Sequence, residues 1–231
     1  MKTIGLIGGM SWESTQTYYR LLNQKVRDEL GGLHSAKLVL YSVDFAEIEA
    51  LQHQGDWDAT AEILGLAGRA VESAGAEFVV LCTNTMHKVA SQIEQAMGIQ
   101  LLHIADATAS ALQKNDITKV GLLGTKFTME QAFYRDRLQA HGIEVIVPDD
   151  AQRELVHSVI YNELCRGDIN ADSRTAYLEV VASLADRGAQ GVILGCTEIG
   201  LLIQSSDTDV PLYDTTEIHA EQAVQFALGR R

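Results

Sequence analysis

The residues best suited to chemistry are three cysteines and the small polar side chains that follow apolar runs. Cys82 and Cys196 each end such a run, and Cys165 stands apart from both. Their odd number and the absence of metal-ligand spacing predict free thiols, with no disulfide framework and no metal site. A thiol has a pKa of roughly 8.5 in water and becomes a base when it ionises. Cys196 stands at an expected strand-to-helix turn, where a helix N-terminus lowers the pKa of a thiol, so it is the best candidate base.

The two runs that end in cysteine belong to an internal repeat. Residues 75–83 align with residues 188–196 at a constant offset, which places Thr83 opposite Cys196. Two further pairs of segments match, residues 4–8 with 120–124 and residues 103–106 with 212–214. Chance similarity between strands of an α/β protein is the alternative interpretation, because Val, Ile, Leu and Gly recur in all such strands. The repeat predicts a chain built from two related halves.

Short apolar runs alternate with helix-length segments along the whole chain. The runs KTIGLIGG, KLVLYSVD, EFVVLCT, LLHIAD, KVGLLGT, IEVIVPD, GVILGCT and VPLYDT are typical of strands buried on both faces. Helices are expected at residues 14–30, 58–74, 129–141 and 172–187, where apolar residues recur every three or four positions. The pattern predicts an α/β fold of two pseudo-symmetric lobes, each with a four-stranded parallel sheet flanked by helices.

The repeat also sets the expected domain boundaries. The helix after Asp106 leads into the second half, so its counterpart after Asp214 is expected to pack beside the first strand of the first half. We therefore predict a first lobe of residues 1–104 plus 212–231 and a second lobe of residues 105–211. The active site is expected in the cleft between the lobes, since parallel sheets bind ligands at the carboxyl ends of their strands.

Two acid–base groups that approach a ligand from opposite sides suit one reaction in particular. Such a pair can remove a proton from one face of a carbon acid and return a proton to the other face. Thr83 and Cys196 are the expected catalytic pair. Other residues of the motifs at the strand ends are expected to bind the substrate. They are Met10, Ser11, Asn84, Thr85, Thr197 and Glu198.

Four segments resemble the aspartate/glutamate racemase family over essentially the whole chain. They are GLIGGMSWEST, LCTNTMHK, GCTEIGLL and YDTTEIHAEQAV. The resemblance implies an amino-acid racemase, hence an isomerase, that acts on L-aspartate or L-glutamate as a homodimer without a cofactor such as pyridoxal phosphate. It also implies two pseudo-symmetric lobes with a cysteine base on each side of the substrate. By similarity, Cys196 deprotonates the L enantiomer.

The sequence departs from this family at the first catalytic position. Family members usually have Cys-Asn-Thr there, whereas this chain has Thr83-Asn84-Thr85, with Cys82 one residue early. Because successive strand residues face opposite sides, Cys82 is expected to point away from a ligand that Thr83 contacts. A threonine hydroxyl is a far weaker acid than a thiol and a poor base. We therefore expect asymmetric catalysis, in which proton abstraction from L-amino acids is favoured and reaction from the D side is impaired.

A second departure concerns the substrate side chain. Aspartate-specific relatives use an arginine and a lysine to bind the distal carboxylate, and the nearest counterparts here are Gln52 and Cys165, with Arg166 adjacent. The loss of both charges leaves two enzyme alternatives open, a broad-specificity racemase for neutral amino acids and a related hydantoin or malonate enzyme. A third alternative is a non-catalytic amino-acid-binding protein.

Several singled-out residues also have ordinary structural interpretations. Cys82 and Cys165 are more simply core residues, and Thr83 is a possible helix cap. Glu198 either orients Thr197 or the substrate amine, or only favours a helix N-terminus. His87 and His219 are structural histidines by default, with a secondary role in proton handling as the alternative.

Charge and composition exclude other classes of function. The 231-residue chain has a net charge of −13 at pH 7 and no cluster of basic residues, which argues against nucleic acid or a membrane surface as a partner. The glycines at positions 8 and 9 do not follow the dinucleotide-binding pattern. No signal peptide or membrane-spanning segment is expected, so the predicted location is the cytoplasm.

Overall fold

A computed structural model describes residues 1–230 and divides the chain into two compact units. The first unit contains Met1–Ile104 together with the segment from His219 onward, and the second unit is Ala105–Ile218. The chain therefore returns to the first unit at residue 219 rather than at residue 212. The reason is that the strand Leu212–Asp214 pairs with the second sheet and keeps this segment in the second unit.

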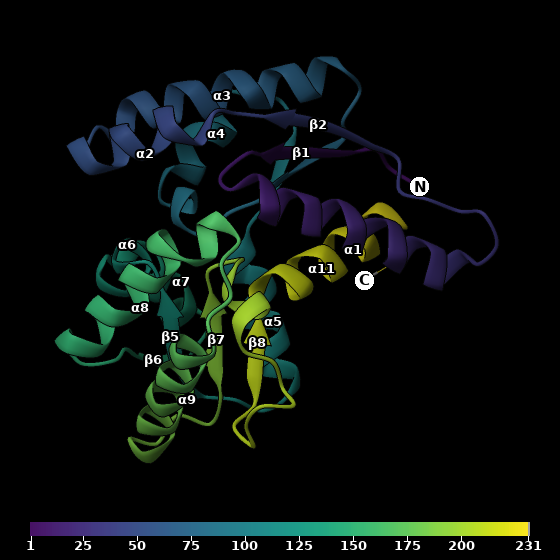
Figure 1. Cartoon of the computed structure of the whole chain (residues 1–231). Helices are drawn as coiled ribbons and strands as arrows, with labels where there is room; N and C mark the ends of the chain where they lie inside the picture. The colour runs from purple at the N-terminus through teal and green to yellow at the C-terminus, as the bar shows by residue number, and fades with distance from the viewer. Residues whose placement is uncertain (231) are drawn as a thin grey trace. The chain divides into compact units, whose positions relative to one another are not determined.

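The first unit is built on a four-stranded parallel sheet (Figure 1). Its strand order is β2-β1-β3-β4, with β1 at Ile4–Gly8, β2 at Leu38–Ser42, β3 at Phe78–Leu81 and β4 at Gln100–Leu102. All residues of β1 and β3 are buried, as expected for strands covered on both faces. Because β1 pairs with β3, the polar residues that follow these two strands share one edge of the sheet.

Helices cover both faces of this first sheet. One face packs against α1 (Trp12–Leu30) and α11 (Thr215–Ala227), which lie side by side in Figure 1. The other face packs against α2 (Phe45–Gln54), α3 (Trp57–Ser73), the 3₁₀ helix η1 (Thr85–Val89) and α4 (Ala90–Gln95). The position of α11 confirms the expected packing, since Ala220, Val224 and Ala227 contact the core cluster that contains Ile4.

The second unit repeats the same sheet topology. Its order is β6-β5-β7-β8, with β5 at Lys119–Gly124, β6 at Glu144–Ile146, β7 at Val192–Gly195 and β8 at Leu212–Asp214, all parallel. All eight strands therefore occur where the apolar runs predicted them. The first strand of each half pairs with both the second and the third, so both sheets place their strands in one order, as the internal repeat predicts.

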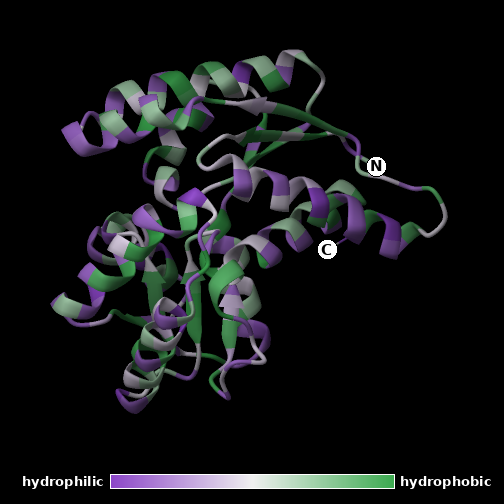
Figure 2. Ribbon diagram, viewed as in Figure 1, coloured by the Kyte–Doolittle hydropathy of each residue, from purple (hydrophilic) through white to green (hydrophobic). Residues whose placement is uncertain are grey.

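The helices of the second unit surround its sheet and supply its core. They are α5 (Ile104–Lys114), α6 (Lys126–Glu130), α7 (Ala132–Ala140), α8 (Asp150–Asn162), η2 (Leu164–Arg166), α9 (Ala171–Asp186) and α10 (Ile199–Leu202). The main core cluster joins β7 to α8 and α9 through residues such as Val156, Val180 and Leu194. Figure 2 shows the strands of this sheet as mostly hydrophobic, while the helices around them alternate in character.

One predicted helix is interrupted. The expected helix at 129–141 is instead the end of α6 followed by α7, with a break at Gln131, whose backbone is extended (φ −82°, ψ 149°). The other three expected helices occur within two residues of their predicted bounds, as α1, α3 and α9. No helix within residues 1–230 is both long and apolar enough to cross a membrane.

Candidate active site

Cys196 lies directly after β7, at the carboxyl edge of the second sheet. The last residue of the strand, Gly195, approaches β5 so closely that a Cβ atom there would lie 2.6 Å from the carbonyl oxygen of Leu123. The chain then turns into α10, and the amide of Ile199 donates a hydrogen bond to the carbonyl of Cys196 over 3.1 Å. The tight contact between β5 and β7 thus fixes the position of Cys196 at the end of the strand.

The carboxylate of Glu198 accepts hydrogen bonds from two neighbouring side chains. Cys196 Sγ donates to Glu198 Oε2 over 2.8 Å, and Thr197 Oγ1 donates to the same oxygen over 2.9 Å. All three residues are buried, and Glu198 is only 2% exposed. Glu198 stands at the N-cap position of α10, yet its side chain makes no capping hydrogen bond. Of its two interpretations, the structure therefore favours an orienting role, and it adds Cys196 to the groups that Glu198 contacts.

The same contacts control the ionisation of the thiol. Burial raises the pKa of Cys196 well above its ordinary value, the charge of Glu198 and the nearby Cys165 raise it further, and the Glu198 amide acts in the opposite direction. The prediction that a helix N-terminus lowers this pKa is wrong, because α10 has only four residues and the sulfur meets a buried carboxylate. Cys196 therefore rests as a thiol whose proton has an acceptor within hydrogen-bond distance.

Cys165 belongs to the same region of the second unit. It lies in η2, is half-buried, and packs against the core cluster that contains Cys196. After burial and Glu198, proximity to Cys165 is a further cause of the raised pKa of Cys196. The nearby Tyr177 is buried, and its hydroxyl donates to the carbonyl of Val156 over 2.8 Å. Cys165 thus lies in the surroundings of Cys196, at the edge of the same core cluster.

Thr83, Asn84 and Thr85 follow β3 at the carboxyl edge of the first sheet and lead into η1. All three are buried, between 3% and 7% exposed. The amide of Thr83 donates to the carbonyl of Leu81 over 2.9 Å, which turns the chain sharply as the strand ends. This is the position in the first unit that corresponds to Cys196 in the second.

Cys82, one residue earlier, is a core residue. Its side chain is fully buried in the cluster that contains Tyr18 and Val224, and burial raises the pKa of its thiol far above the ordinary value. Its sulfur donates weakly to the carbonyl of Val80 over 3.9 Å. This position corresponds to the ordinary structural interpretation of Cys82 as a core residue.

A glycine turn and a threonine shape the loop after β1. Gly9 has a φ of 97°, and a Cβ atom there would lie 2.2 Å from the carbonyl oxygen of Val43, so no other residue fits this turn. Thr15 Oγ1 accepts from the Gly9 amide and donates to the Ser11 carbonyl, both over 2.8 Å. Ser11 Oγ caps α1, and the Met10 side chain packs into the core. Met10, predicted to bind the substrate, is therefore a core side chain that is only 4% exposed.

Gln52 is buried within the first unit rather than displayed on its surface. It comes from the last turns of α2, is 4% exposed, and donates from Nε2 to the sulfur of Met86 over 2.9 Å. Met86 belongs to η1, directly after the segment that carries Thr83. The structure thus brings Gln52 next to the polar segment of the first unit, with an uncharged amide in a buried setting.

The predicted site residues form two groups, one in each unit. In the second unit Glu198 accepts hydrogen bonds from both Cys196 and Thr197, and Cys165 packs against the core cluster that contains Cys196. In the first unit the segment after β3 lies beside the loop after β1, because the two strands are paired, and Gln52 supports it through Met86. Each unit therefore carries its own set of candidate groups at the corresponding strand end.

Two buried histidines turn out to have fixed hydrogen-bond partners. His219 Nε2 donates to the carbonyl of Leu102 over 2.8 Å, and its Nδ1 accepts from the hydroxyl of Tyr18 over 2.9 Å. Burial lowers the pKa of His219 to about 4, so the ring is neutral near pH 7. His87 contacts the backbone of Thr83, and Thr15 contacts the Gly9 amide. The sequence did not indicate either of these contacts near the site. The one signal for His87 was its spacing, four residues after Thr83.

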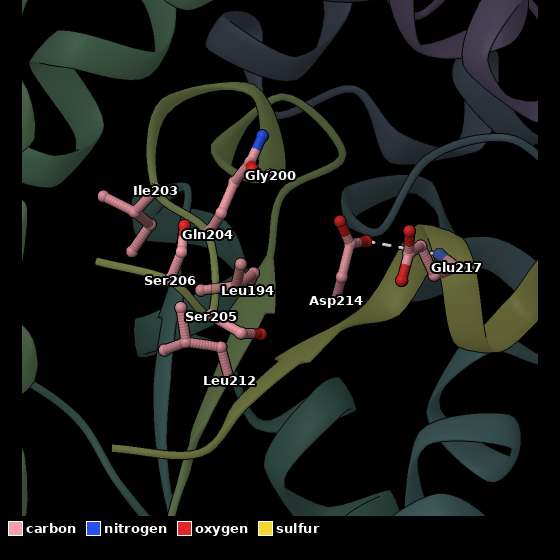
Figure 3. Close-up of a pocket in the computed structure, with 9 residues that line it drawn as sticks. All are labelled: Leu194, Gly200, Ile203, Gln204, Ser205, Ser206, Leu212, Asp214 and Glu217. Carbon is pink, nitrogen blue, oxygen red and sulfur yellow. Dashed lines mark hydrogen bonds between the residues drawn. The ribbon is translucent and has the colours of Figure 1, made fainter. Parts of the chain in front are cut away.

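A separate pocket of about 410 Å³ lies in the second unit (Figure 3). Its lining includes Leu194, Gln204 and Glu217, together with Asp214, which accepts a hydrogen bond from the amide of Glu217. None of the residues predicted for the site lines this pocket. Among residues 1–230, no group of three or more His, Cys, Asp or Glu side chains is arranged to hold a metal ion.

These features define a class of protein. Two parallel sheets of identical strand order carry buried polar groups at equivalent strand ends, a thiol paired with a carboxylate in one unit and a threonine in the other. The chain belongs to the Asp/Glu/hydantoin racemase family, whose sequence profile matches residues 7–223. Racemases are isomerases.

Individual relatives agree with this assignment. The chain is 25% identical to the broad-specificity amino-acid racemase RacX of Bacillus subtilis, over 98% of both proteins. It is 59% identical to a crystal structure from Yersinia pestis described as a candidate Asp/Glu racemase, with a TM-score of 0.92 and coverage of 99% of this chain and 100% of the other. It is 35% identical to PH1733, an aspartate racemase homologue from Pyrococcus horikoshii, with a TM-score of 0.86 and the same coverage.

Proposed function

We propose that this protein racemises an amino acid without a cofactor, with Cys196 as the base for the L enantiomer and Thr83 acting at the opposite face of Cα. L-Aspartate and L-glutamate are the proposed substrates. The observation that carries the proposal is the buried hydrogen bond from the Cys196 thiol to the Glu198 carboxylate. It supplies a nucleophilic sulfur together with a place for its proton, which is the requirement for a thiolate base in a site that raises the thiol pKa.

In the L-to-D direction, Glu198, Cys196 and Thr83 each move one proton and each ends in its starting state. The Glu198 carboxylate takes the thiol proton, and the resulting thiolate removes the Cα hydrogen to give a thiol and a substrate carbanion. The Thr83 hydroxyl donates its proton to the other face of the carbanion while it takes a proton from water, which leaves hydroxide. The proton on Glu198 then returns to solvent and neutralises that hydroxide, so only the configuration at Cα has changed.

The weakness of the Thr83 hydroxyl as an acid gives this reaction a particular kinetic form. The equilibrium constant of a racemisation is one, so kcat/KM for inversion must be equal in the two directions. The asymmetry appears instead in isotope exchange. From the L side, Cys196 removes and returns a proton many times before Thr83 delivers one, whereas from the D side almost every carbanion collapses to L.

A broad-specificity racemase for neutral amino acids is the second candidate. It is favoured by the uncharged Gln52, which is buried against Met86, and by Cys165, whose side chain is a thiol rather than the ammonium group of a lysine. RacX, which matches 98% of the chain, is named as a broad-specificity amino-acid racemase. The two candidates differ only in the substrate side chain and share the proposed catalytic groups.

The test is a solvent-exchange assay with the unmodified protein. Each L- and D-amino acid of a panel that includes aspartate, glutamate and neutral side chains is incubated in D₂O. Deuterium at Cα is followed by NMR and configuration by chiral chromatography. We expect L-aspartate or L-glutamate to exchange faster than it inverts, while the D isomer gains deuterium only as it inverts. Faster reaction of neutral substrates would select the second candidate, and no exchange with any amino acid would leave a binding protein or another substrate class.

Glu198 has two proposed effects on Cys196: its charge raises the pKa of the thiol, and its carboxylate accepts the thiol proton. Replacing Glu198 with glutamine separates these two effects. Loss of the negative charge lowers the pKa of the Cys196 thiol, because like-charge repulsion no longer opposes the thiolate. We therefore expect alkylation of Cys196, resolved by peptide mass spectrometry across pH, to begin at lower pH. Exchange from L-aspartate is nevertheless expected to fall by about 100-fold, since the thiol proton has lost its acceptor.

Thr197→Val is the matched control for this change. It removes the second donor to the same Glu198 oxygen while it keeps the negative charge. We expect a much smaller loss of exchange in this variant and little change in the pH at which Cys196 alkylates. Faster exchange in Glu198→Gln than in the unmodified protein would show that the carboxylate only suppresses the thiolate and takes no proton from it.

A further inference from the structure

The backbone of Thr83 is held at both of its polar groups. Its amide donates to the carbonyl of Leu81 over 2.9 Å, and its carbonyl is 2.8 Å from Nδ1 of His87. A carbonyl oxygen only accepts hydrogen bonds, so Nδ1 of His87 must carry a proton. Because threonine is branched at Cβ, its side chain has few rotamers, and a fixed backbone limits the directions that the hydroxyl can take.

The other ring nitrogen of His87 has a partner of the opposite kind. The amide of Ile104 donates to His87 Nε2 over 3.2 Å, so Nε2 must be unprotonated. The amide of Ile104 lies at the start of α5, where backbone amides have no partner inside the helix. His87 is 3% exposed. The two bonds together specify a neutral ring with its single proton on Nδ1, which leaves neither nitrogen for proton exchange with a substrate.

These contacts connect Thr83 to a particular place in the chain. Ile104 is the last residue of the first unit before the chain passes into the second. His87 comes from η1, and its ring also packs edge-on to those of His103, at 4.5 Å between centroids, and His219, at 5.9 Å. His219 is the first residue after the chain returns to the first unit. His87 thus contacts residues at both points where the chain crosses between the two units, Ile104 and His219.

We propose that His87 is a positioning residue for Thr83, which fixes the Thr83 carbonyl through Nδ1–H while its Nε2 anchors the amide of Ile104. This inference rests on the proposed function, because it assigns His87 to the proton transfer at the Thr83 face. It also excludes His87 from direct proton handling. A displacement of about 1 Å at a reacting group costs roughly 100-fold in rate, so loss of the bond to the Thr83 carbonyl is expected to slow delivery from that face.

Two substitutions separate the two hydrogen bonds of His87. In His87→Asn the side-chain amide reaches the position of Nδ1, so it can donate to the Thr83 carbonyl but not accept from Ile104. In His87→Gln the amide oxygen reaches the position of Nε2, so it can accept from Ile104, and the bond to Thr83 is lost. His103→Gln is the control for a change among the packed rings, and His34→Asn is the control at an exposed histidine.

The readout is the ratio of inversion to Cα exchange for the L substrate in D₂O. Loss of folded protein lowers both rates equally and leaves this ratio unchanged. We expect His87→Gln to lower the ratio by about 10-fold or more, and His87→Asn and both controls to stay within about twofold of the unmodified protein. An unchanged ratio in His87→Gln, or an equal fall in His87→Asn, would overturn the proposal.

A second measurement tests the inference independently of catalysis. Long-range ¹H–¹⁵N correlation spectra of the imidazole rings in the unmodified protein report which nitrogen carries the proton. We expect the Nδ1–H form for His87 and the Nε2–H form for His219, and a protonated or Nε2–H ring at His87 would contradict the proposal. If the unmodified protein exchanges no amino acid, the proposed function fails and only the tautomer result bears on His87.

Discussion

Replacing Cys196 with alanine is expected to abolish both Cα exchange and inversion, with a loss of at least about 1,000-fold in each. Glu198 remains in this variant, but the thiol whose proton it accepts, and therefore the thiolate that removes the Cα hydrogen, is gone. Thr83 cannot compensate, because inversion needs a second acid–base group and a threonine hydroxyl is a poor base. The measurement is deuterium incorporation into L-aspartate and L-glutamate in D₂O, with the D isomer followed in the same samples.

Cys82→Ala is the control that distinguishes loss of a catalytic thiol from loss of a buried one. Cys82 is fully buried in the core of the first unit, so this change affects stability and leaves the thiol–carboxylate pair intact. We expect exchange per folded molecule to persist in Cys82→Ala, with folding checked by a thermal melt. Exchange that survives in Cys196→Ala would assign the base on the L side to another residue.

Replacing Thr83 with cysteine is expected to raise the rate of inversion by about 100-fold. A thiol is a much stronger acid than a hydroxyl, so it returns a proton to the carbanion more often and also removes one from the D isomer. Because the equilibrium constant is one, kcat/KM should rise equally in both directions. Exchange with retention should become measurable from the D side, and the excess of exchange over inversion from the L side should shrink.

Thr83→Ser is the matched control, since it keeps a hydroxyl and loses only the methyl group. We expect its ratio of exchange to inversion from L-aspartate to stay close to that of the unmodified protein. If the Thr83→Cys variant exchanges L-aspartate normally but inverts it no faster, Thr83 does not deliver the second proton. Another group, or ordered water, would then act at that face.

The fold could be predicted largely from local patterns. Strands buried on both faces have continuous apolar runs, so all eight were located, and the repeat predicted the common strand order. The break between α6 and α7 could not be predicted, because the residues around Gln131 include neither proline nor glycine. The return of the chain at residue 219 depends on the pairing of β8 with β7, which is a tertiary contact.

The candidate site was predictable by position but less so by chemistry. Motifs after strands placed Thr83 and Cys196 at equivalent edges, as two related sheets require. The pKa of Cys196 was predicted in the wrong direction, since the general effect of a helix N-terminus gave no indication that Glu198 would turn back onto the sulfur. The bond from Ile104 to His87 spans 17 residues and depends on how η1 and α5 pack.

The interrupted first unit has a consequence for how the chain is made. Its core needs α11, whose residues Ala223 and Val224 pack with Ile4 and Leu6 of the first strand. Residues 105–218 form one continuous stretch and are synthesised in full before the segment that completes the first core. Since domains generally fold as units during synthesis, the second unit can complete its folding before the first unit has all of its core residues. During synthesis we therefore expect the middle of the chain to become resistant to proteases before the first unit does.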